Sequence, residues 1–178
     1  MTRANIMRLA ALAAVSAMIP GVSGAQRLTG PNPTGAVPAP VSLETRGLFQ
    51  EKFASVGSDV FISGQPTERA LRDLRAQGVV TVVNLRTPEF PYSPTAVKSF
   101  AAAMTGAKGK VLLHCTIAWR ASHLWAAYLI QYRDVPVATA LQQARMINLM
   151  DDMRMDGDKQ PVESFLGRTL PEVGHPKQ

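Results

Sequence analysis

The chain has 178 residues, of which 46% are hydrophobic, 6% aromatic and 18% charged, with 13 Gly, 13 Pro and a single Cys. This content of apolar residues excludes wholesale disorder, one cysteine excludes a disulfide scaffold, and the length favours a single domain. The formal net charge is +6, but the 19 Lys and Arg residues are scattered singly and aromatic residues are scarce. The pattern argues against a nucleic-acid partner, and we interpret the charge as a preference for anionic ligands.

The first 25 residues have the pattern of a secretory signal peptide. Arg3 and Arg8 precede an apolar run at residues 9–19, and small residues stand before a cleavage site that follows Ala25. The alternative is a membrane anchor, but the run of about 11 residues is well short of the roughly 20 that span a bilayer. We therefore expect cleavage, a charge that falls from +6 to +4 without Arg3 and Arg8, and a periplasmic or secreted protein with no stable membrane anchor.

The next segment, residues 26–47, is rich in Gly, Pro, Ala, Thr and Asn and has almost no bulky apolar residue. Such a composition does not bury enough surface to offset the entropy of ordering, so we expect a linker or flexible arm. The folded domain is expected to span residues 48–168, and a flexible tail is expected at residues 169–178.

Three apolar runs in the domain predict strands, at residues 59–63, 79–85 and 110–114. The second and third are continuously apolar, which is typical of parallel strands buried on both faces. Each strand is followed by the start signal of a helix or by an apolar helical pattern. This alternation predicts right-handed crossovers and a parallel arrangement of the strands.

Helix signals follow the strands along the chain. Thr67 is a good N-cap and Gly78 a good helix stop, while Ser93 and Pro94 resemble an N-cap with proline at the first helical position. With the apolar stripes that follow, these signals predict five helices, at residues 67–78, 93–106, 121–133, 136–149 and 162–166. The sequence therefore predicts an α/β fold with a small, mostly parallel sheet flanked by helices.

The chemistry concentrates at one strand-to-helix turn, where residues 111–122 read V-L-L-H-C-T-I-A-W-R-A-S. Backbone N–H groups in such a turn, together with the positive end of the helix dipole, can hold an anion and favour the thiolate form of Cys115. The planar fork of Arg120 can grip two oxygens of a phosphate. A lone Cys at a strand end can also be a small buried apolar residue, but the order of strand, Cys, loop, Arg and helix favours an anion site.

Three segments carry a resemblance to a known family: H-C-T-I-A-W-R-A-S, F-I-S-G-Q-P-T and V-V-N-L-R-T-P-E. Together they resemble the bacterial dual-specificity-phosphatase-like family, often labelled beta-lactamase-hydrolase-like, which is a branch of the cysteine-dependent phosphatases. The similarity extends over residues 53–168. The segment I-S-G-Q-P-T adds specificity, because neither rhodaneses nor ordinary tyrosine phosphatases are expected to share it.

The resemblance implies a role for each residue of the loop. Cys115 is the nucleophile that forms a cysteinyl-phosphate, and Arg120 binds the phosphoryl oxygens. His114 matches the histidine that orients the loop, although a buried core histidine explains it equally well. The backbone N–H groups of four further residues bind the phosphate: Thr116, Ile117, Ala118 and Trp119.

Three features of the loop and of the residue after it depart from the wider phosphatase pattern. Ordinary tyrosine phosphatases have one more residue between Cys and Arg than the four found here, and four is also typical of rhodaneses. The usual loop glycine is Ala118, which is unfavourable if that residue needs a positive φ. The hydroxyl residue that commonly follows Arg is Ala121, so Ser122 or Thr116 would have to reach the sulfur instead.

The segment before the predicted helix at residues 93–106 is shorter than in the relatives. They have an extra helix and strand there, and phosphatases of this kind carry a general-acid Asp on that loop, whereas this chain has no Asp between Asp73 and Asp134. A cysteinyl-phosphate route still needs a proton for the leaving oxygen. We interpret the nearest carboxylates as surface charges or caps rather than catalytic acids: Glu89, Asp151 and Asp152.

The leading hypothesis is a secreted phosphatase that hydrolyses phosphate monoesters, from a phosphorylated protein or a small metabolite, with no cofactor and no metal. Rhodanese-like sulfur transfer through a Cys115 persulfide is an alternative suggested by the loop spacing. A third hypothesis is an anion-binding module without catalysis, suggested by the missing acid. His123 and Trp125, in the helix behind the loop, are interpreted as core packing.

Overall fold

The computed structural model describes residues 26–33, 35–87, 91–155 and 158–173. The predicted signal peptide, residues 1–25, lies outside these described residues. Within the described ranges, no helix has both the length and the apolar character needed to cross a bilayer.

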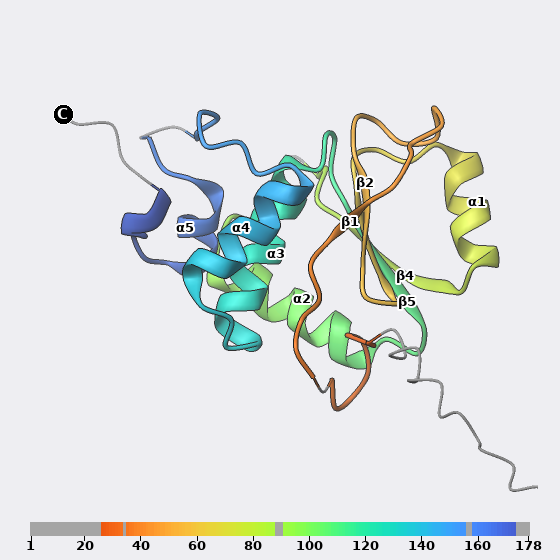
Figure 1. Cartoon of the computed structure of the whole chain (residues 1–178), viewed down its shortest axis with the longest axis horizontal. Coiled ribbons are helices and arrows are strands. Elements are labelled where there is room, and N and C mark those ends of the chain that lie inside the picture. Colours follow the sequence, from red (N-terminus) through yellow and green to blue (C-terminus); the bar gives the residue numbers. More distant parts are fainter. Residues whose placement is uncertain (1–25, 34, 88–90, 156–157, 174–178) are drawn as a thin grey trace, which may run out of the picture.

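A five-stranded sheet runs through the molecule (Figure 1). Its parallel part consists of β3 (Val60–Ser63), β5 (Lys110–His114) and β4 (Val79–Asn84), in that spatial order, which confirms the three predicted strands. β1 (Val41–Ser42) and β2 (Phe53–Val56) extend the sheet beyond β3 with antiparallel pairing. These two strands were not predicted, because both are short and neither has a continuous apolar run.

Helices cover both faces of the sheet, as predicted (Figure 1). α1 (Glu68–Ala76) lies on one face, where it packs against β4. The other face carries α2 (Pro94–Gly106), α3 (Trp119–Tyr132), α4 (Val137–Ile147) and α5 (Pro161–Leu166). All five predicted helices are present, and α3 begins two residues earlier than the predicted range.

The alternation of side chains along the strands divides the core into two parts. Val111 and Leu113 of β5 belong to the large core beneath α2 to α5, whereas Leu112 belongs to a smaller core beneath α1. The large core holds Phe100, Trp125 and other fully buried side chains. The smaller core consists mainly of Phe49, Phe61, Ala70, Leu74, Val79 and Leu112.

The prediction that the strand at residues 79–85 is buried on both faces was wrong. β4 is the edge strand of the sheet, and the side chains of Val80 and Val82 are 62% and 49% exposed. α1 packs against β4 but leaves these two valines uncovered. The apolar run in β4 therefore does not mean that both faces of the strand are buried. The buried central strand is β5.

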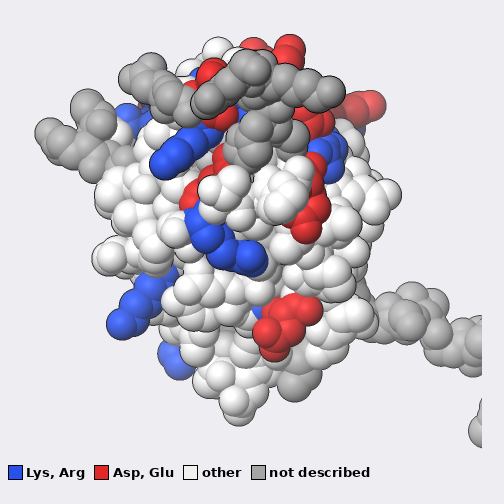
Figure 2. Space-filling model, turned by 90° about the vertical axis from the view of Figure 1, so that its left-hand side faces the viewer, with Lys and Arg blue, Asp and Glu red and all other residues white. Residues whose placement is uncertain are grey.

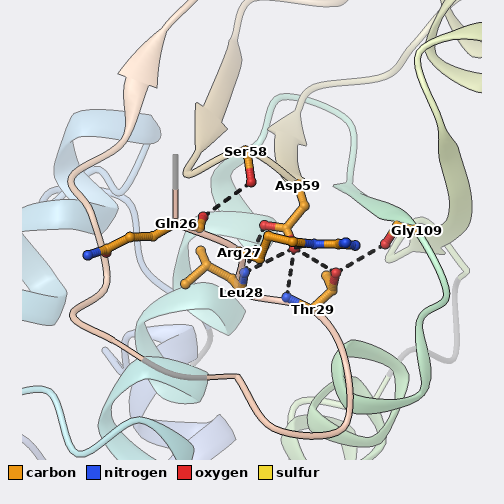
Figure 3. A network of polar contacts seen from close by, with 7 residues as sticks. All are labelled: Gln26, Arg27, Leu28, Thr29, Ser58, Asp59 and Gly109. Atoms are coloured by element: carbon orange, nitrogen blue, oxygen red, sulfur yellow. Dashed lines mark hydrogen bonds and ion pairs between the residues drawn. The ribbon is translucent and has the colours of Figure 1, made fainter. Parts of the chain in front are cut away.

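The segment at residues 26–47 was expected to be a linker or flexible arm, but parts of its described residues pack on the domain. The carboxylate of Asp59 accepts hydrogen bonds from the backbone N–H groups of Leu28 and Thr29 and from the Thr29 hydroxyl, at 2.6 to 3.0 Å (Figure 3). The Thr29 hydroxyl also lies 3.1 Å from the carbonyl oxygen of Gly109. Leu28 is fully buried in the large core, and these contacts offset the ordering entropy that composition alone did not cover.

The described part of the tail at residues 169–178 also differs from the prediction of flexibility. The backbone N–H of Leu170 donates to the carboxylate of Glu163 at 2.8 Å. Val173 is buried in the large core at the end of a short 3-10 helix, Pro171–Val173. A few anchoring contacts therefore order a segment whose sequence lacks a helical or strand pattern.

Charged side chains of both signs are dispersed over the face that carries α5 in Figure 1 (Figure 2). The ion pairs among the described residues are mostly local ones on exposed side chains. Arg145, for example, pairs with Asp151 at 2.7 Å, and Arg69 pairs with Asp73 one helical turn away at 3.8 Å. Exposed pairs of this kind contribute little to stability, so the apolar cores carry the fold.

Candidate anion site at the end of strand β5

The only cysteine lies in the predicted turn between β5 and α3. β5 ends at His114 and α3 begins at Trp119, so residues 115–118 form the connecting loop. Ser63 of β3 and Asn84 of β4 are both in register with His114. The loop therefore lies at the carboxyl edge of the parallel strands, which is where open α/β sheets bind their ligands.

The segment that follows β3 holds one side of this loop. The backbone N–H of Gln65 donates to the carbonyl oxygen of Thr116 at 2.8 Å, and the N–H of Cys115 donates to the carbonyl oxygen of Ser63 at 3.3 Å. Gly64 permits this approach, because a Cβ atom there would lie 2.9 Å from the Thr116 carbonyl oxygen. The I-S-G-Q-P-T segment thus acts as a support for the loop.

Asn148 is a further residue that binds the loop, and it was not predicted from the sequence. It is the C-cap residue of α4, it is buried, and its side-chain amide donates a hydrogen bond to the carbonyl oxygen of Ile117. An Asn after a helix is typical of an ordinary cap. No local sequence signal therefore pointed to a contact with the loop.

The backbone N–H groups around Cys115 form a set of available donors. Among the described residues, no protein acceptor is bound by the N–H groups of Thr116, Ile117, Trp119 or Arg120. The last two belong to the first turn of α3, where N–H groups have no partner within the helix. Since the helix dipole adds a partial positive charge at this end, the loop has the donors and the field that an anion requires.

Ala118 occupies a left-handed backbone conformation, with φ 66° and ψ −4°, at the N-cap of α3. The sequence analysis identified this position as unfavourable for alanine if it required a positive φ, and the structure has that conformation. For a residue with a Cβ atom the left-handed region costs about 1–2 kcal/mol. The carbonyl oxygen of Ala118 accepts the first hydrogen bond of the helix, from the N–H of Ser122 at 2.9 Å.

Arg120 lies in the first turn of α3 and is half-buried. Within the part of the chain that the structure describes, it forms no ion pair with a carboxylate. Its guanidinium lies close enough to the hydroxyl group of Tyr92 to act on the pKa of that group. Among the described residues, no acidic side chain neutralises the positive charge of Arg120.

Tyr92 is a second site residue that the sequence analysis missed. It lies just before α2, close enough to Arg120 and Cys115 for their charges to act on its hydroxyl group. Burial raises the pKa of Tyr92 and the Cys115 charge acts in the same direction, while Arg120 opposes both. A tyrosine in a loop carries no motif of its own, so only the fold brings it to this site.

His114, at the end of β5, is buried. Its ring lies close to the Cys115 backbone, although among the described residues Nδ1 reaches no partner at hydrogen-bonding geometry. Burial lowers the pKa of His114, the Cys115 backbone opposes this effect, and the charge of Arg86 supports it. His114 is thus a neutral group beneath the loop, and a role in orienting the loop stays a prediction.

Ser122 is completely buried, and its hydroxyl donates to the carbonyl oxygen of Trp119 at 2.7 Å. That bond uses the hydroxyl proton within the first turn of α3, so it does not serve the Cys115 sulfur. Ser122 supports the loop by fixing the helix start. Thr116, the other hydroxyl considered for the sulfur, is half-buried within the loop.

The acidic residues considered from the sequence supply no carboxylate to the described part of the site. Asp151 forms two hydrogen bonds with Arg145, at 2.7 and 2.8 Å, and this contact lowers the pKa of its carboxyl group. Asp152 is exposed, and Glu89 lies outside the described residues. Within the described ranges, no three His, Cys, Asp or Glu side chains gather in a way that could hold a metal ion.

No protein-family model and no curated protein matches the chain. Among solved structures, it is similar to a cysteine-to-serine variant of TpbA from P. aeruginosa in complex with pTyr, with 15% identity, coverage of 63% of this chain and 80% of that chain, and a TM-score of 0.49. A DUF442 protein from Shewanella putrefaciens has 20% identity, coverage of 56% and 82%, and a TM-score of 0.43. A glycine-to-alanine variant of Tk-PTP has 20% identity, coverage of 51% and 78%, and a TM-score of 0.43.

Proposed function

We propose that this protein hydrolyses phosphate monoesters with Cys115 as the nucleophile. The observation that carries the proposal is the joint position of three features at one strand end. These are a cysteine, a set of N–H groups at residues 116, 117, 119 and 120 that bind no protein acceptor among the described residues, and Arg120 without a carboxylate partner there. A tetrahedral anion bearing two negative charges matches this set of donors better than an uncharged substrate does.

The proposed reaction has two steps. In the first, the Cys115 sulfur attacks phosphorus, an S–P bond forms, and the P–O bond to the leaving group breaks with its electron pair on the leaving oxygen. In the second, water attacks phosphorus, the S–P bond breaks, and inorganic phosphate and the thiolate are released. Arg120 and the loop N–H groups hold the phosphoryl oxygens, whose charge they stabilise most strongly in the transition state.

Sulfur transfer through a Cys115 persulfide is the second candidate, supported by the four-residue spacing between Cys115 and Arg120. The same anion-binding loop would hold thiosulfate, whose outer sulfur would pass to Cys115 with release of sulfite. Cyanide would then remove that sulfur as thiocyanate. The third possibility is that the protein binds phosphate but turns over neither substrate. One experiment distinguishes the three possibilities.

We also propose that the protein acts outside the cytoplasm, in the periplasm or after secretion. The basic start, short apolar run and small residues of the first 25 positions support this proposal. Mass spectrometry of protein exported by a host cell tests it, because cleavage after Ala25 leaves Gln26 as the first residue. Retention of residues 1–25 in the exported protein would contradict it.

The experiment uses the chain from Gln26 onwards with an aryl phosphate, with thiosulfate plus cyanide, and with vanadate as a phosphate mimic. The phosphatase proposal expects release of phosphate that falls by at least about three orders of magnitude in Cys115→Ser. Arg120→Lys keeps the charge but loses the planar fork, so a loss on the order of 10²-fold is expected.

Phosphate release that survives in Cys115→Ser would overturn the cysteinyl mechanism. Thiocyanate production without phosphate release would favour sulfur transfer, and tight vanadate binding without either product would leave an anion-binding module. Arg145→Lys is a matched control, because this arginine pairs with Asp151 on the surface and the same change there should leave phosphate release unchanged.

A further inference from the structure

Arg86 follows β4 at the same edge of the sheet as the loop that carries Cys115. Asn84, the last residue of β4, is in register with His114, and the backbone N–H of Leu85 donates to the carbonyl oxygen of His114 at 2.9 Å. The side-chain oxygen of Asn84 accepts a hydrogen bond from the backbone N–H of Arg86, also at 2.9 Å. These two bonds fix the backbone at Arg86 beside the residue that precedes Cys115.

The side chain of Arg86 is directed toward the segment that follows β3. Its Nη1 atom donates a hydrogen bond to Oε1 of Gln65 at 2.8 Å. The backbone N–H of Gln65 in turn donates to the carbonyl oxygen of Thr116, also at 2.8 Å. Gln65 thus binds the loop with its backbone and Arg86 with its side chain, so only one residue stands between the guanidinium and the loop.

The contact with Gln65 leaves the charge of Arg86 unbalanced. The acceptor is a neutral amide oxygen, and among the described residues Arg86 forms no ion pair. A guanidinium has five N–H donors in a planar fork, and this bond uses one of them. The remaining donors can therefore bind an anionic group.

Arg86 and the loop differ in their exposure. Cys115 is only 1% exposed, so the phosphoryl group of a bound ester would be enclosed by the loop, whereas Arg86 is exposed. Arg120, in the first turn of α3, is the arginine assigned to the phosphoryl oxygens. The part of the ester that projects from the loop is its leaving group, and Arg86 is the cation at the rim on the β4 side.

We propose that Arg86 is a specificity-determining residue that selects phosphate monoesters whose leaving group carries a second anionic group, a role that rests on the phosphatase function proposed above. A carboxylate or a second phosphate offers paired oxygens to the planar fork of the guanidinium. An uncharged leaving group gains nothing from this contact. Charge complementarity of this kind contributes more to the choice of partner than to total affinity.

Two esters of equal size test the preference for charge. 4-Carboxyphenyl phosphate has an anionic leaving group, and 4-carbamoylphenyl phosphate has a neutral one of the same shape. In Arg86→Gln we expect kcat/KM to fall about three- to fivefold more on the carboxylate ester than on the amide, as for an exposed ion pair. Comparing variant with native protein cancels the difference in leaving-group acidity. 1,4-Phenylene bisphosphate, tested in the same way, distinguishes a second phosphate from a carboxylate by the larger loss.

Arg75→Gln is the matched control. Arg75 is an exposed arginine in the last turn of α1, just before β4 begins, so it carries the same charge at the other end of that strand from Arg86. The same substitution there should change the ratio between the two esters by less than about 1.5-fold. Arg86→Lys should keep part of the preference, because it retains the charge but loses the fork.

Salt supplies an independent readout. At about 1 M NaCl, where the Debye length is about 3 Å, the native protein should lose most of its preference and approach Arg86→Gln. Equal losses on the charged and neutral esters in Arg86→Gln would mean that Arg86 only supports the loop through Gln65, and would overturn the proposal. Phosphate release that shows no dependence on Arg86 would overturn this inference alone, whereas no release from any of these esters by the native protein would overturn the proposed function as well.

Discussion

The side-chain amide of Asn148 donates a hydrogen bond to the carbonyl oxygen of Ile117, 31 residues earlier in the chain. The bond joins the end of α4 to the loop that carries Cys115. This hydrogen bond occupies the carbonyl oxygen of Ile117 and fixes its position. If the loop binds an anion as proposed, Asn148 supports that loop from α4.

Asn148→Asp tests this support. The carboxylate has nearly the shape of the amide but no N–H donor, so it would face the Ile117 carbonyl oxygen with a negative charge. We expect inhibition by inorganic phosphate to weaken about tenfold or more, and the free energy of unfolding to fall by about 1–3 kcal/mol. Gln142→Glu is the same chemical change at an exposed position of α4 and should alter neither quantity. Unchanged phosphate inhibition in Asn148→Asp would contradict the supporting role.

Because Ala118 has a left-handed backbone conformation, we expect its replacement by glycine to change the free energy of unfolding very little. Ala118→Gly removes the left-handed penalty of about 1–2 kcal/mol, which offsets the cost of added unfolded-state entropy and of one lost buried methyl group. The net change in unfolding free energy should be within about 0.5 kcal/mol of zero.

Ala126→Gly is the comparison, because Ala126 is also completely buried but has helical backbone within α3. The same atoms are removed there without relief of strain, so a loss of about 1.5–2 kcal/mol is expected. Urea unfolding measures both variants. Equal losses in the two would show that Ala118 is not strained.

The parts of the fold that could be predicted from sequence are those with a local cause. Thr67 caps α1 by accepting a hydrogen bond from the N–H of Ala70 at 3.2 Å, and the apolar run before Cys115 is the buried strand β5. Both features depend on neighbours along the chain. The placement of Cys115 and Arg120 across one turn followed from the same kind of local pattern.

The missed parts depend on contacts between distant segments. The sequence of β4 predicts a buried strand, but side chains of β4 are exposed because it is the edge strand of the sheet. Leu28 is ordered by the carboxylate of Asp59, 31 residues away. Tyr92 and Asn148 reach the loop for the same reason, since the fold and not a motif brings them there. Composition and motif spacing do not predict such contacts between residues that are far apart in the sequence.

Because Asp59 binds the N-terminal segment, we expect its replacement by Asn to lower the free energy of unfolding markedly. Asp59 is 2% exposed, and its two oxygens accept hydrogen bonds from three groups on Leu28 and Thr29. Asp59→Asn replaces one acceptor with an NH₂ group that faces N–H donors, so we expect a loss of about 2–4 kcal/mol in unfolding free energy.

Proteolysis supplies a second readout of the same contact, because release of residues 26–40 should expose the segment to cleavage. Asp73→Asn is the matched control, since Asp73 is exposed on α1 and pairs with Arg69 at 3.8 Å. A change below about 0.5 kcal/mol is expected there. If Asp59→Asn were as mild as Asp73→Asn, the segment would not depend on this carboxylate.

Because His123 is buried, we expect the free energy of unfolding to fall in acid. It is completely buried in α3, and among the described residues neither ring nitrogen has a hydrogen-bond partner. Burial lowers the pKa of His123 from 6.5 to about 3, while the nearby charge of Asp151 opposes the shift. Below pH 6.5 the unfolded chain binds a proton that the folded protein does not bind, so stability falls by up to about 1.4 kcal/mol per pH unit until about pH 3.

His123→Phe removes this proton while keeping an aromatic ring against Trp119, whose centroid lies 5.1 Å from that of His123. The unfolding free energy should therefore drop less between pH 7.5 and pH 5 in the variant than in the native protein, by about 2 kcal/mol. His114, whose pKa is also lowered by burial, accounts for part of the drop that remains in both proteins. Urea titrations at the two pH values measure the difference. An equal drop in the two proteins would mean that His123 binds its proton equally well in the folded and unfolded states, which its burial without partners makes energetically unfavourable.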